Sequence, residues 1–236
     1  MRKKILKLIL GITVIFGIIV LLNIDVITHQ GINYRIHTIR LPLYLKVLDF
    51  FDRHYNYKLI VDRIIGESTA EEEKTLKIFI WTHKNIRKAP EGLPVIDDHV
   101  WHTIIRGYGI NDQSSDVFTT LCNYASSEAF FCWIEGENPD QEIPLSFIKI
   151  KGRWNVFDPY NGNYFKNTKG DLAAIEDIIK GDWLIESIDS LNAPDVKYAQ
   201  YFKNLILIKE VNLTRANIQS PFNRLKFEIK KYLKLI

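Results

Sequence analysis

The stretch 104–135 constrains the fold of this chain more than any other part of the sequence. It opens with Arg106-Gly107-Tyr108-Gly109, a turn in which glycine supplies backbone angles that other residues rarely adopt. The polar residues 111–114 come next and are typical of a helix start. The apolar residues after them recur on two adjacent helical stripes, which are Val117, Leu121 and Tyr124, and Phe118, Cys122, Ala125 and Ala129. Two such stripes predict a helix that is buried over most of its surface.

This helix leads directly into residues 130–134, a short apolar run that predicts a central β-strand. Three more strands are predicted over 145–151, 154–158 and 163–165, with a tight turn at Gly152-Arg153. Strands joined in this way form an antiparallel meander. A meander packed against one buried helix is an α+β architecture.

Two helices are predicted before this core. A helical pattern runs from residue 40 to residue 65, with Pro42 suited to its first turn. Ser68-Thr69-Ala70-Glu71 predicts a capping box that starts a second helix, and His83 lies on or near the apolar stripe of that helix. A histidine in that setting is typical of a hydrogen-bonded structural side chain. We therefore expect a helical lead-in over 28–67 and a core domain over 68–180.

The segment 181–236 is predicted to be a C-terminal extension. A short helix over 171–180 precedes it and ends at Gly181, and a further helix is expected around 196–205. Segment 220–236 carries five basic residues against one acid, and one helical stripe of it is apolar: Phe222, Leu225, Ile229, Leu233 and Ile236. The pattern fits two placements, a helix on an anionic membrane surface or a terminal helix docked on the domain with its lysines in water.

The N-terminus begins with Met1-Arg2-Lys3-Lys4 and continues as an almost wholly apolar run from Ile5 to Leu22. Eighteen residues of helix span about 27 Å, close to the roughly 30 Å hydrocarbon core of a bilayer. A cleaved signal peptide usually has a shorter apolar core, and no Ala-x-Ala-like site follows Leu22. We therefore expect a single transmembrane anchor within 1–27, with the basic N-terminus in the cytoplasm and the body outside it.

The net positive charge of the chain comes from its N-terminal tip. Without the four basic residues of 1–22, the 31 basic residues fall to 27, against 28 acids. A near-neutral body lacks the basic stripe that a nucleic-acid-binding protein needs. The two cysteines, Cys122 and Cys132, both fall in apolar segments. Two buried free thiols fit these apolar settings better than a disulfide between Cys122 and Cys132, and the sequence leaves both states open.

The segment Asp97-Asp98-His99-Val100-Trp101-His102 concentrates carboxylates and imidazoles, which are groups that bind metal ions. Its spacing matches no established ligand motif, and such residues in a loop commonly serve as caps or surface groups. We therefore predict no metal site and no cofactor.

Four stretches, by their order and spacing, resemble the transglutaminase-like superfamily, which shares the core of papain-type cysteine proteases. They span roughly residues 68–180 and are Trp81-Thr82-His83-Lys84-Asn85-Ile86-Arg87, residues 106–118, Lys151-Gly152-Arg153-Trp154 and Val156-Phe157-Asp158-Pro159. The resemblance implies a buried central helix packed on an antiparallel sheet, behind an N-terminal transmembrane helix.

In that superfamily a cysteine at the start of the buried helix is the nucleophile, a histidine on a following strand is the base, and an aspartate on the next strand orients the histidine. By this resemblance the nucleophile falls on Asn111, the histidine near Ile143 or Pro144, and the aspartate on Asp158. Asn111 has no thiol, and neither Ile143 nor Pro144 can transfer a proton. No histidine follows His102, so a small shift of the alignment supplies no base. The resemblance therefore implies a degenerate member that lacks the cysteine and the histidine of the triad.

The leading hypothesis is a membrane-anchored, catalytically inactive domain that acts as a binding or scaffold module in the bacterial cell envelope. Its cleft would be formed by the helix start with Asp112, Gln113, Trp133 and His102, and it would bind a peptide, a glycan or an envelope protein. By analogy, surface-polysaccharide assembly is a reasonable setting.

Two further hypotheses stand beside it. One is an active hydrolase or acyl transferase with relocated residues, such as His99 or His102 acting with Cys122, Ser114 or Ser115. The other is a structural partner of a membrane complex, held by the N-terminal helix and by the basic segment 220–236.

Overall fold

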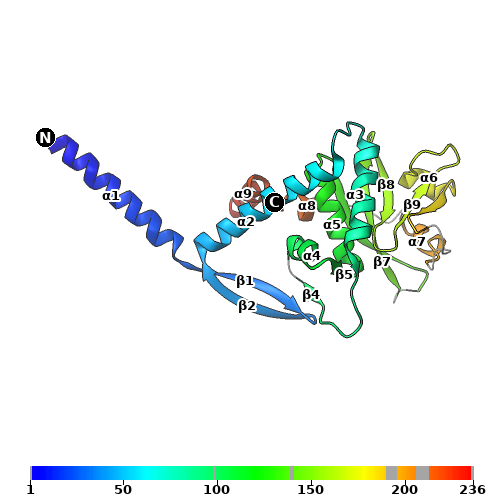
Figure 1. Cartoon of the computed structure of the whole chain (residues 1–236), viewed down its shortest axis with the longest axis horizontal. Helices are drawn as coiled ribbons and strands as arrows, with labels where there is room; N and C mark the ends of the chain where they lie inside the picture. Colours follow the sequence, from blue (N-terminus) through cyan, green and yellow to red (C-terminus); the bar gives the residue numbers. More distant parts are fainter. Residues whose placement is uncertain (1, 98, 139–140, 190–195, 206–212, 235–236) are drawn as a thin grey trace. The chain divides into compact units, whose positions relative to one another are not determined.

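The structure is a computed structural model that describes residues 2–97, 99–138, 141–189, 196–205 and 213–234. It is a mixed fold of helices and mainly antiparallel strands (Figure 1). The chain divides into two compact units. One comprises residues 1–53 and 94–98, and the other comprises residues 54–93 and 99–236.

Helix α1 (Arg2–Leu22) is the predicted anchor segment and belongs to the first unit. It is 21 residues long, and none of its residues is buried. At 1.5 Å per residue such a helix is about 32 Å long, which matches the thickness of a hydrocarbon core. By length and composition α1 can therefore cross a membrane.

A β-hairpin follows α1. Strand β1 (Asp25–Ile32) pairs antiparallel with β2 (Arg35–Pro42) and, on its other edge, with the short β4 (Ile96–Asp97). The loop between β1 and β2 consists of Asn33 and Tyr34, both at positive φ (49° and 63°). Two consecutive residues at positive φ form the tight turn whose twist matches that of a hairpin.

The hairpin occupies the first part of segment 28–67, for which the sequence predicted a helical lead-in. Helix α2 (Leu43–Ile65) begins three residues later than predicted, because Pro42 is the last residue of β2 and pairs with Asp25. A hairpin forms here in place of a helix because the two strands are rich in β-branched residues. Asn33, in the turn that joins them, is a residue type that tolerates positive φ.

Helix α3 (Glu71–Asn85) starts where the sequence predicted a second helix, but without the expected capping box. The residue before it, Ala70, has no side chain that can cap the helix, and Ser68 Oγ instead donates a hydrogen bond to Glu73 Oε1 at 2.8 Å. Acidic residues fill the first turn, where they interact favourably with the helix dipole.

Helix α4 (Val100–Arg106) ends at Gly107, whose φ of 70° closes the helix in the left-handed conformation. The chain then forms β5 (Tyr108–Gly109), which pairs in parallel with β3 (Arg87–Lys88). Helix α5 (Asn111–Tyr124) follows and begins at Asn111, and every residue from Ser114 to Cys122 is buried. The prediction of a buried helix starting at this position is confirmed.

The predicted meander is present as part of a five-stranded antiparallel sheet in the order β10-β9-β8-β7-β6. The first strand of the meander lies at the edge of this sheet, so the prediction of a central strand is wrong. It is nevertheless apolar because it is packed on both faces. The strands are β6 (Ala129–Glu135), β7 (Glu142–Ile150), β8 (Arg153–Asp158), β9 (Asn163–Lys166) and β10 (Leu184–Ser187).

Two hydrophobic clusters lie on opposite faces of the sheet. The first joins α5 to Ile148 and Ile150 of β7, and the second joins Leu145 and Phe147 of β7 to the short helix α7 (Ala199–Phe202). This division follows from the strand backbone, since successive side chains point to opposite faces. Figure 1 shows α3 and α5 on one side of the strands, and α6 (Ile175–Ile179) and α7 on the other.

Both helices on the second face are shorter than predicted. Leu172 and Ala174 form isolated bridges with β9 and β8, so α6 occupies only part of 171–180. Gly181 follows at a φ of 78°, as expected for a residue that ends a helix. The chain closes with α8 (Thr214–Asn217) and α9 (Pro221–Tyr232), which is the predicted basic amphipathic helix.

Candidate functional site

The start of α5 is shaped by a compact turn. Gln113 Oε1 accepts a hydrogen bond from the Ile110 amide at 3.2 Å and another from the Arg106 guanidinium at 3.5 Å. A Cβ atom on Gly109 would lie 3.0 Å from Gln113 Oε1 and 3.2 Å from Thr103 Cγ2, so a larger residue here would force these side chains to shift. The turn therefore fixes the first residue of α5.

That first residue, Asn111, is half-buried together with its neighbours Asp112 and Gln113. Its Oδ1 accepts a hydrogen bond from the Asp112 amide at 2.8 Å. A carboxamide has no ionisable nucleophile, and here its oxygen is engaged by the helix start. The position predicted for the nucleophile therefore holds a carboxamide whose oxygen is bound by the helix backbone.

The three positions predicted from the sequence for the triad do not share a face of the sheet. Ile143 packs in the second cluster, and Asp158 binds Tyr198 of the same cluster, whereas α5 packs in the first. Strand alternation places Pro144, paired with Trp133, on the α5 face instead. Ile143 and Asp158 are 7% and 2% exposed, so the sheet separates both side chains from the start of α5.

The Asp158 carboxylate is fully engaged by its neighbours. Tyr198 OH donates to Oδ2 at 2.6 Å, Asn161 Nδ2 donates to Oδ2 at 2.8 Å, and the Asn161 amide donates to Oδ1 at 3.1 Å. Burial raises the pKa of Asp158, and these hydrogen bonds oppose the rise. Burial and the adjacent carboxylate also raise the pKa of Tyr198, which therefore remains a proton donor. Asn163 completes the network through its Nδ2, 2.9 Å from Tyr198 OH.

A polar link connects this network to the turn before α5. Lys88 pairs with Gly109 in the β3–β5 ladder, and its Nζ donates to Asn161 Oδ1 at 3.3 Å. The same Nζ lies 4.8 Å from the centre of the Tyr160 ring. Lys88, Asn161 and Tyr198 were not predicted as site residues. The turn-forming residues Tyr160-Asn161-Gly162 are the signal in the sequence that could have found Asn161, since Asn in a turn commonly binds nearby backbone and side chains.

His83 is a hydrogen-bonded side chain, as the sequence predicted. Its Nδ1 lies 3.0 Å from the Pro159 carbonyl oxygen, and its Nε2 lies 2.9 Å from Asp189 Oδ2. A Cβ on Gly162 would lie 2.7 Å from the His83 ring. The imidazole therefore braces the β8–β9 turn, which also holds Asp158 and Asn161.

Neither cysteine is placed to react. Cys122 is fully buried, and burial raises the pKa of its thiol well above the usual value. Burial also raises the pKa of Cys132 to about 11. Both are free thiols, as the sequence favoured, but only Cys122 is buried, and Cys132 is partly exposed.

The other residues proposed for a relocated site are scattered. Ser114 and Ser115 are fully buried in α5, and their hydroxyls have no hydrogen-bond partner in the described part of the chain. His99 and His102 form an edge-to-face pair with ring centroids 5.7 Å apart. Trp133 is 45% exposed on the edge strand β6. Neither serine hydroxyl is hydrogen-bonded to a base, and burial raises the pKa of both thiols, so these four candidates are not activated as nucleophiles in the described part of the chain.

The described residues contain no cluster of three or more histidine, cysteine, aspartate or glutamate side chains that could hold a metal ion. Asp98, one of the residues considered for such a site, lies outside the described residues.

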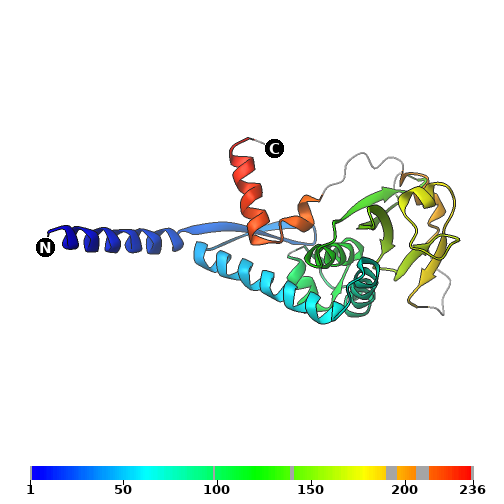
Figure 2. The same ribbon diagram turned by 90° about the horizontal axis from the view of Figure 1, so that it is seen from above.

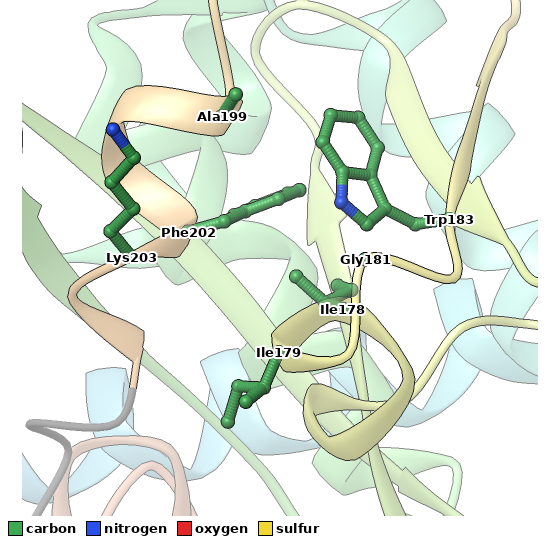
Figure 3. Close-up of a pocket in the computed structure, with 7 residues that line it drawn as sticks. All are labelled: Ile178, Ile179, Gly181, Trp183, Ala199, Phe202 and Lys203. Atoms are coloured by element: carbon green, nitrogen blue, oxygen red, sulfur yellow. The ribbon is translucent and has the colours of Figure 1, made fainter.

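A pocket of about 200 Å³ lies on the sheet face opposite α5 (Figure 3). Trp183 and Phe202 form its aromatic walls, with ring centroids 4.9 Å apart and nearly perpendicular planes, and Lys203 lies at its edge. None of the cleft residues predicted from the sequence lines this pocket; the lining residues are Ile178, Ile179, Gly181, Trp183, Ala199, Phe202 and Lys203.

Neither a protein-family model nor a curated protein matches this sequence. Two solved structures are partly similar to it. One is a candidate protease from Parabacteroides distasonis ATCC 8503, with 15% identity and a TM-score of 0.37, covering 52% of this chain and 28% of the other. The second is a candidate cysteine protease from Cytophaga hutchinsonii, with 16% identity and a TM-score of 0.39, covering 62% of this chain and 56% of the other. The chain thus covers less than two thirds of each of these proteins.

Proposed function

We propose that this protein is a membrane-anchored binding module of the cell envelope, built on a transglutaminase-like core without the catalytic chemistry of that superfamily. One observation carries the proposal. The residue at the start of the buried helix is Asn111, whose Oδ1 accepts a hydrogen bond from the Asp112 amide at 2.8 Å. A side chain without a thiol or hydroxyl cannot form the acyl intermediate that this chemistry needs.

The strand positions support the same proposal. Ile143 is an aliphatic core residue, and the Asp158 carboxylate binds Tyr198 and Asn161 where an orienting aspartate would bind a histidine. The loss of the nucleophile and of the base removes the mechanism as a whole, because these groups act as a unit.

The binding surface in this proposal is the region around the start of α5. Asn111, Asp112 and Gln113 offer amide and carboxylate groups, and Trp133 offers a partly exposed aromatic ring. Polar groups combined with an aromatic ring suit a peptide or a glycan, since both combine hydrogen-bonding groups with flat or apolar parts. Surface-polysaccharide assembly is the setting that we propose by analogy.

The anchor in this proposal is α1, with the basic N-terminus in the cytoplasm and the body outside it. The length and composition of α1 support a membrane span, and the basic residues at its N-terminal end support this orientation.

Restoring the missing groups tests the proposal. Hydrolysis of a glutamine-containing peptide and incorporation of a fluorescent primary amine would be compared among the full-length chain, Asn111→Cys, and Asn111→Cys combined with Ile143→His or with Pro144→His. We expect no activity from the native chain. We also expect the thiol introduced by Asn111→Cys to be alkylated at a lower pH than an ordinary thiol, because a helix start stabilises the thiolate. Turnover by the native chain would overturn the proposal.

Binding is tested separately by tryptophan fluorescence with soluble peptidoglycan fragments and with the same peptide. A saturable change that Trp133→Phe abolishes supports the proposed surface. Trp183→Phe is the matched control, since Trp183 lies in the pocket on the other face of the sheet.

A further inference from the structure

Helix α9 exposes an apolar stripe. Phe222, Leu225, Ile229 and Leu233 are 73%, 60%, 50% and 57% exposed. At 100° per residue these side chains fall within a sector of roughly 80°. Figure 2 shows α9, in red, standing away from the sheet of its unit. The structure therefore differs from one of the two placements that the sequence left open, in which this helix docks on the domain.

The remaining surface of α9 is strongly basic. Glu228, its one acid, pairs with Arg224 at 2.7 Å. The four lysines of this segment form no ion pair with a carboxylate in the described part of the chain; these lysines are Lys226, Lys230, Lys231 and Lys234. On the helix surface, Lys226 borders the apolar stripe. An apolar stripe bordered by unpaired lysines is the pattern of a helix that lies in the interface of an anionic bilayer.

The chain immediately before α9 is fastened to α5. Arg215 Nη2 lies 2.7 Å from Asp116 Oδ2, Asn123 Nδ2 donates to Asn217 Oδ1 at 2.8 Å, and Tyr124 OH donates to the Gln219 carbonyl at 3.0 Å. Arg215 also lies over the Phe131 ring at 5.2 Å. These contacts fix the segment that leads into α9, so the domain holds the first turn of the helix while the stripe remains uncovered.

We propose that α9 is a second membrane contact, which lies flat on an anionic lipid surface with its apolar stripe inserted among the lipid chains. The net positive charge of segment 220–236, which carries five basic residues and one acid, favours an anionic lipid surface as the partner of the stripe. Length excludes a second span, because 12 helical residues reach only about 18 Å. The chain also carries α1, a helix able to cross the same membrane. This inference does not depend on the ligand of the proposed binding module.

Fluorescent labelling of the full-length chain in liposomes tests the proposal. An environment-sensitive dye is attached at Ile229→Cys, in a Cys132→Ser background that leaves only the buried Cys122. Asn223→Cys is the matched control, since it is exposed on the lysine-bearing side of the same helix. Each protein is reconstituted in phosphatidylcholine with or without one third phosphatidylglycerol, and quenching by a lipid-borne nitroxide and by aqueous iodide is measured.

With phosphatidylglycerol, we expect the dye at residue 229 to be quenched by the nitroxide lipid and protected from iodide, with the reverse at residue 223. Lys226→Ser with Lys230→Ser should reduce the lipid quenching at 229 to the level of pure phosphatidylcholine. Iodide access at 229 in anionic liposomes would overturn the proposal. Protection from iodide without lipid quenching would also overturn it, because a protein surface or a second copy of the chain would then cover the stripe.

Discussion

The Tyr198 hydroxyl donates a hydrogen bond to Asp158 Oδ2 at 2.6 Å, and both side chains are buried. The two residues lie 40 positions apart, and their contact joins the C-terminal part of the second unit to the end of β8. A charged acceptor with a buried hydroxyl donor forms one of the stronger hydrogen bonds in proteins. This contact therefore holds the region around Tyr198 against the end of β8, and it engages the Asp158 carboxylate.

Replacing Tyr198 with phenylalanine removes this donor from a buried carboxylate. We expect Tyr198→Phe to lower the free energy of unfolding by about 1–3 kcal/mol, because a buried polar group that loses a partner keeps its desolvation cost. Urea unfolding followed by circular dichroism measures the change. Tyr201→Phe is the control, since no hydrogen bond among the described residues involves that hydroxyl. Equal stabilities of the two variants would contradict the prediction.

Asp158 should also make stability depend on pH in an unusual direction. Its pKa in the folded protein is raised by burial, so between about pH 4 and that raised pKa the native state binds more protons than the unfolded chain. The stability contribution of this group therefore falls as pH rises. Compared with Asp158→Asn, the native chain should gain stability on going from pH 7 to pH 4.5. Urea unfolding of both proteins at the two pH values gives the difference, and a relative loss of stability in acid would contradict the prediction.

The two thiols should be inert in the native state. With a pKa of about 11, Cys132 is a thiolate in roughly one molecule in a thousand at pH 8, so alkylation should be on the order of a hundredfold slower than for a free thiol. Cys122 should react only after unfolding, because it is fully buried. Iodoacetamide labelling with and without guanidinium, read by peptide mass spectrometry, tests both statements. Rapid labelling of Cys122 in the native protein would contradict the prediction and support the hypothesis of a relocated cysteine nucleophile.

The Arg215–Asp116 pair should fasten the segment that carries α9. Asp116 is buried while the Arg215 side chain is 55% exposed, so solvent screens the pair, and Arg215→Ala should destabilise by only about 1 kcal/mol. Its clearer effect is local, with faster amide hydrogen exchange over 213–220. Arg224→Ala is the matched control, because the Arg224–Glu228 pair has the same 2.7 Å separation but both of its side chains are exposed. Faster exchange in the control as well would argue against a specific fastening.

The hairpin turn offers a stabilising substitution. Tyr34 adopts a φ of 63° and is 88% exposed, so its side chain adds little packing to offset the strain of a left-handed backbone. Tyr34→Gly should therefore stabilise the hairpin by about 0.5–1 kcal/mol, and Tyr34→Val should destabilise it by a similar amount. Hydrogen exchange of the β1 and β2 amides reports the change in hairpin stability. Destabilisation by Tyr34→Gly would contradict the prediction, because it would show that packing of the tyrosine ring contributes more than the backbone strain costs.

Local sequence patterns determined several of the helices and strands of this protein. The apolar run of α1, the two stripes of α5 and the alternation in the meander each specify an element through the spacing of neighbouring residues. The same sequence also establishes that Asn111 supplies no thiol and that no histidine follows His102. Where local signals conflicted, the prediction failed: Pro42 was consistent with a helix start, but the turn at Asn33 and Tyr34 made it the end of a strand.

Only the tertiary structure decided which distant groups meet. The Asp158 carboxylate binds Tyr198, Lys88 reaches Asn161, and the sheet separates Ile143 from the start of α5. Each of these relations depends on strand register and on the face to which a side chain points, and a shift of one residue reverses that face. The exposure of the α9 stripe was likewise undecided, because the same amphipathic pattern suits a docked helix and a helix on a membrane surface.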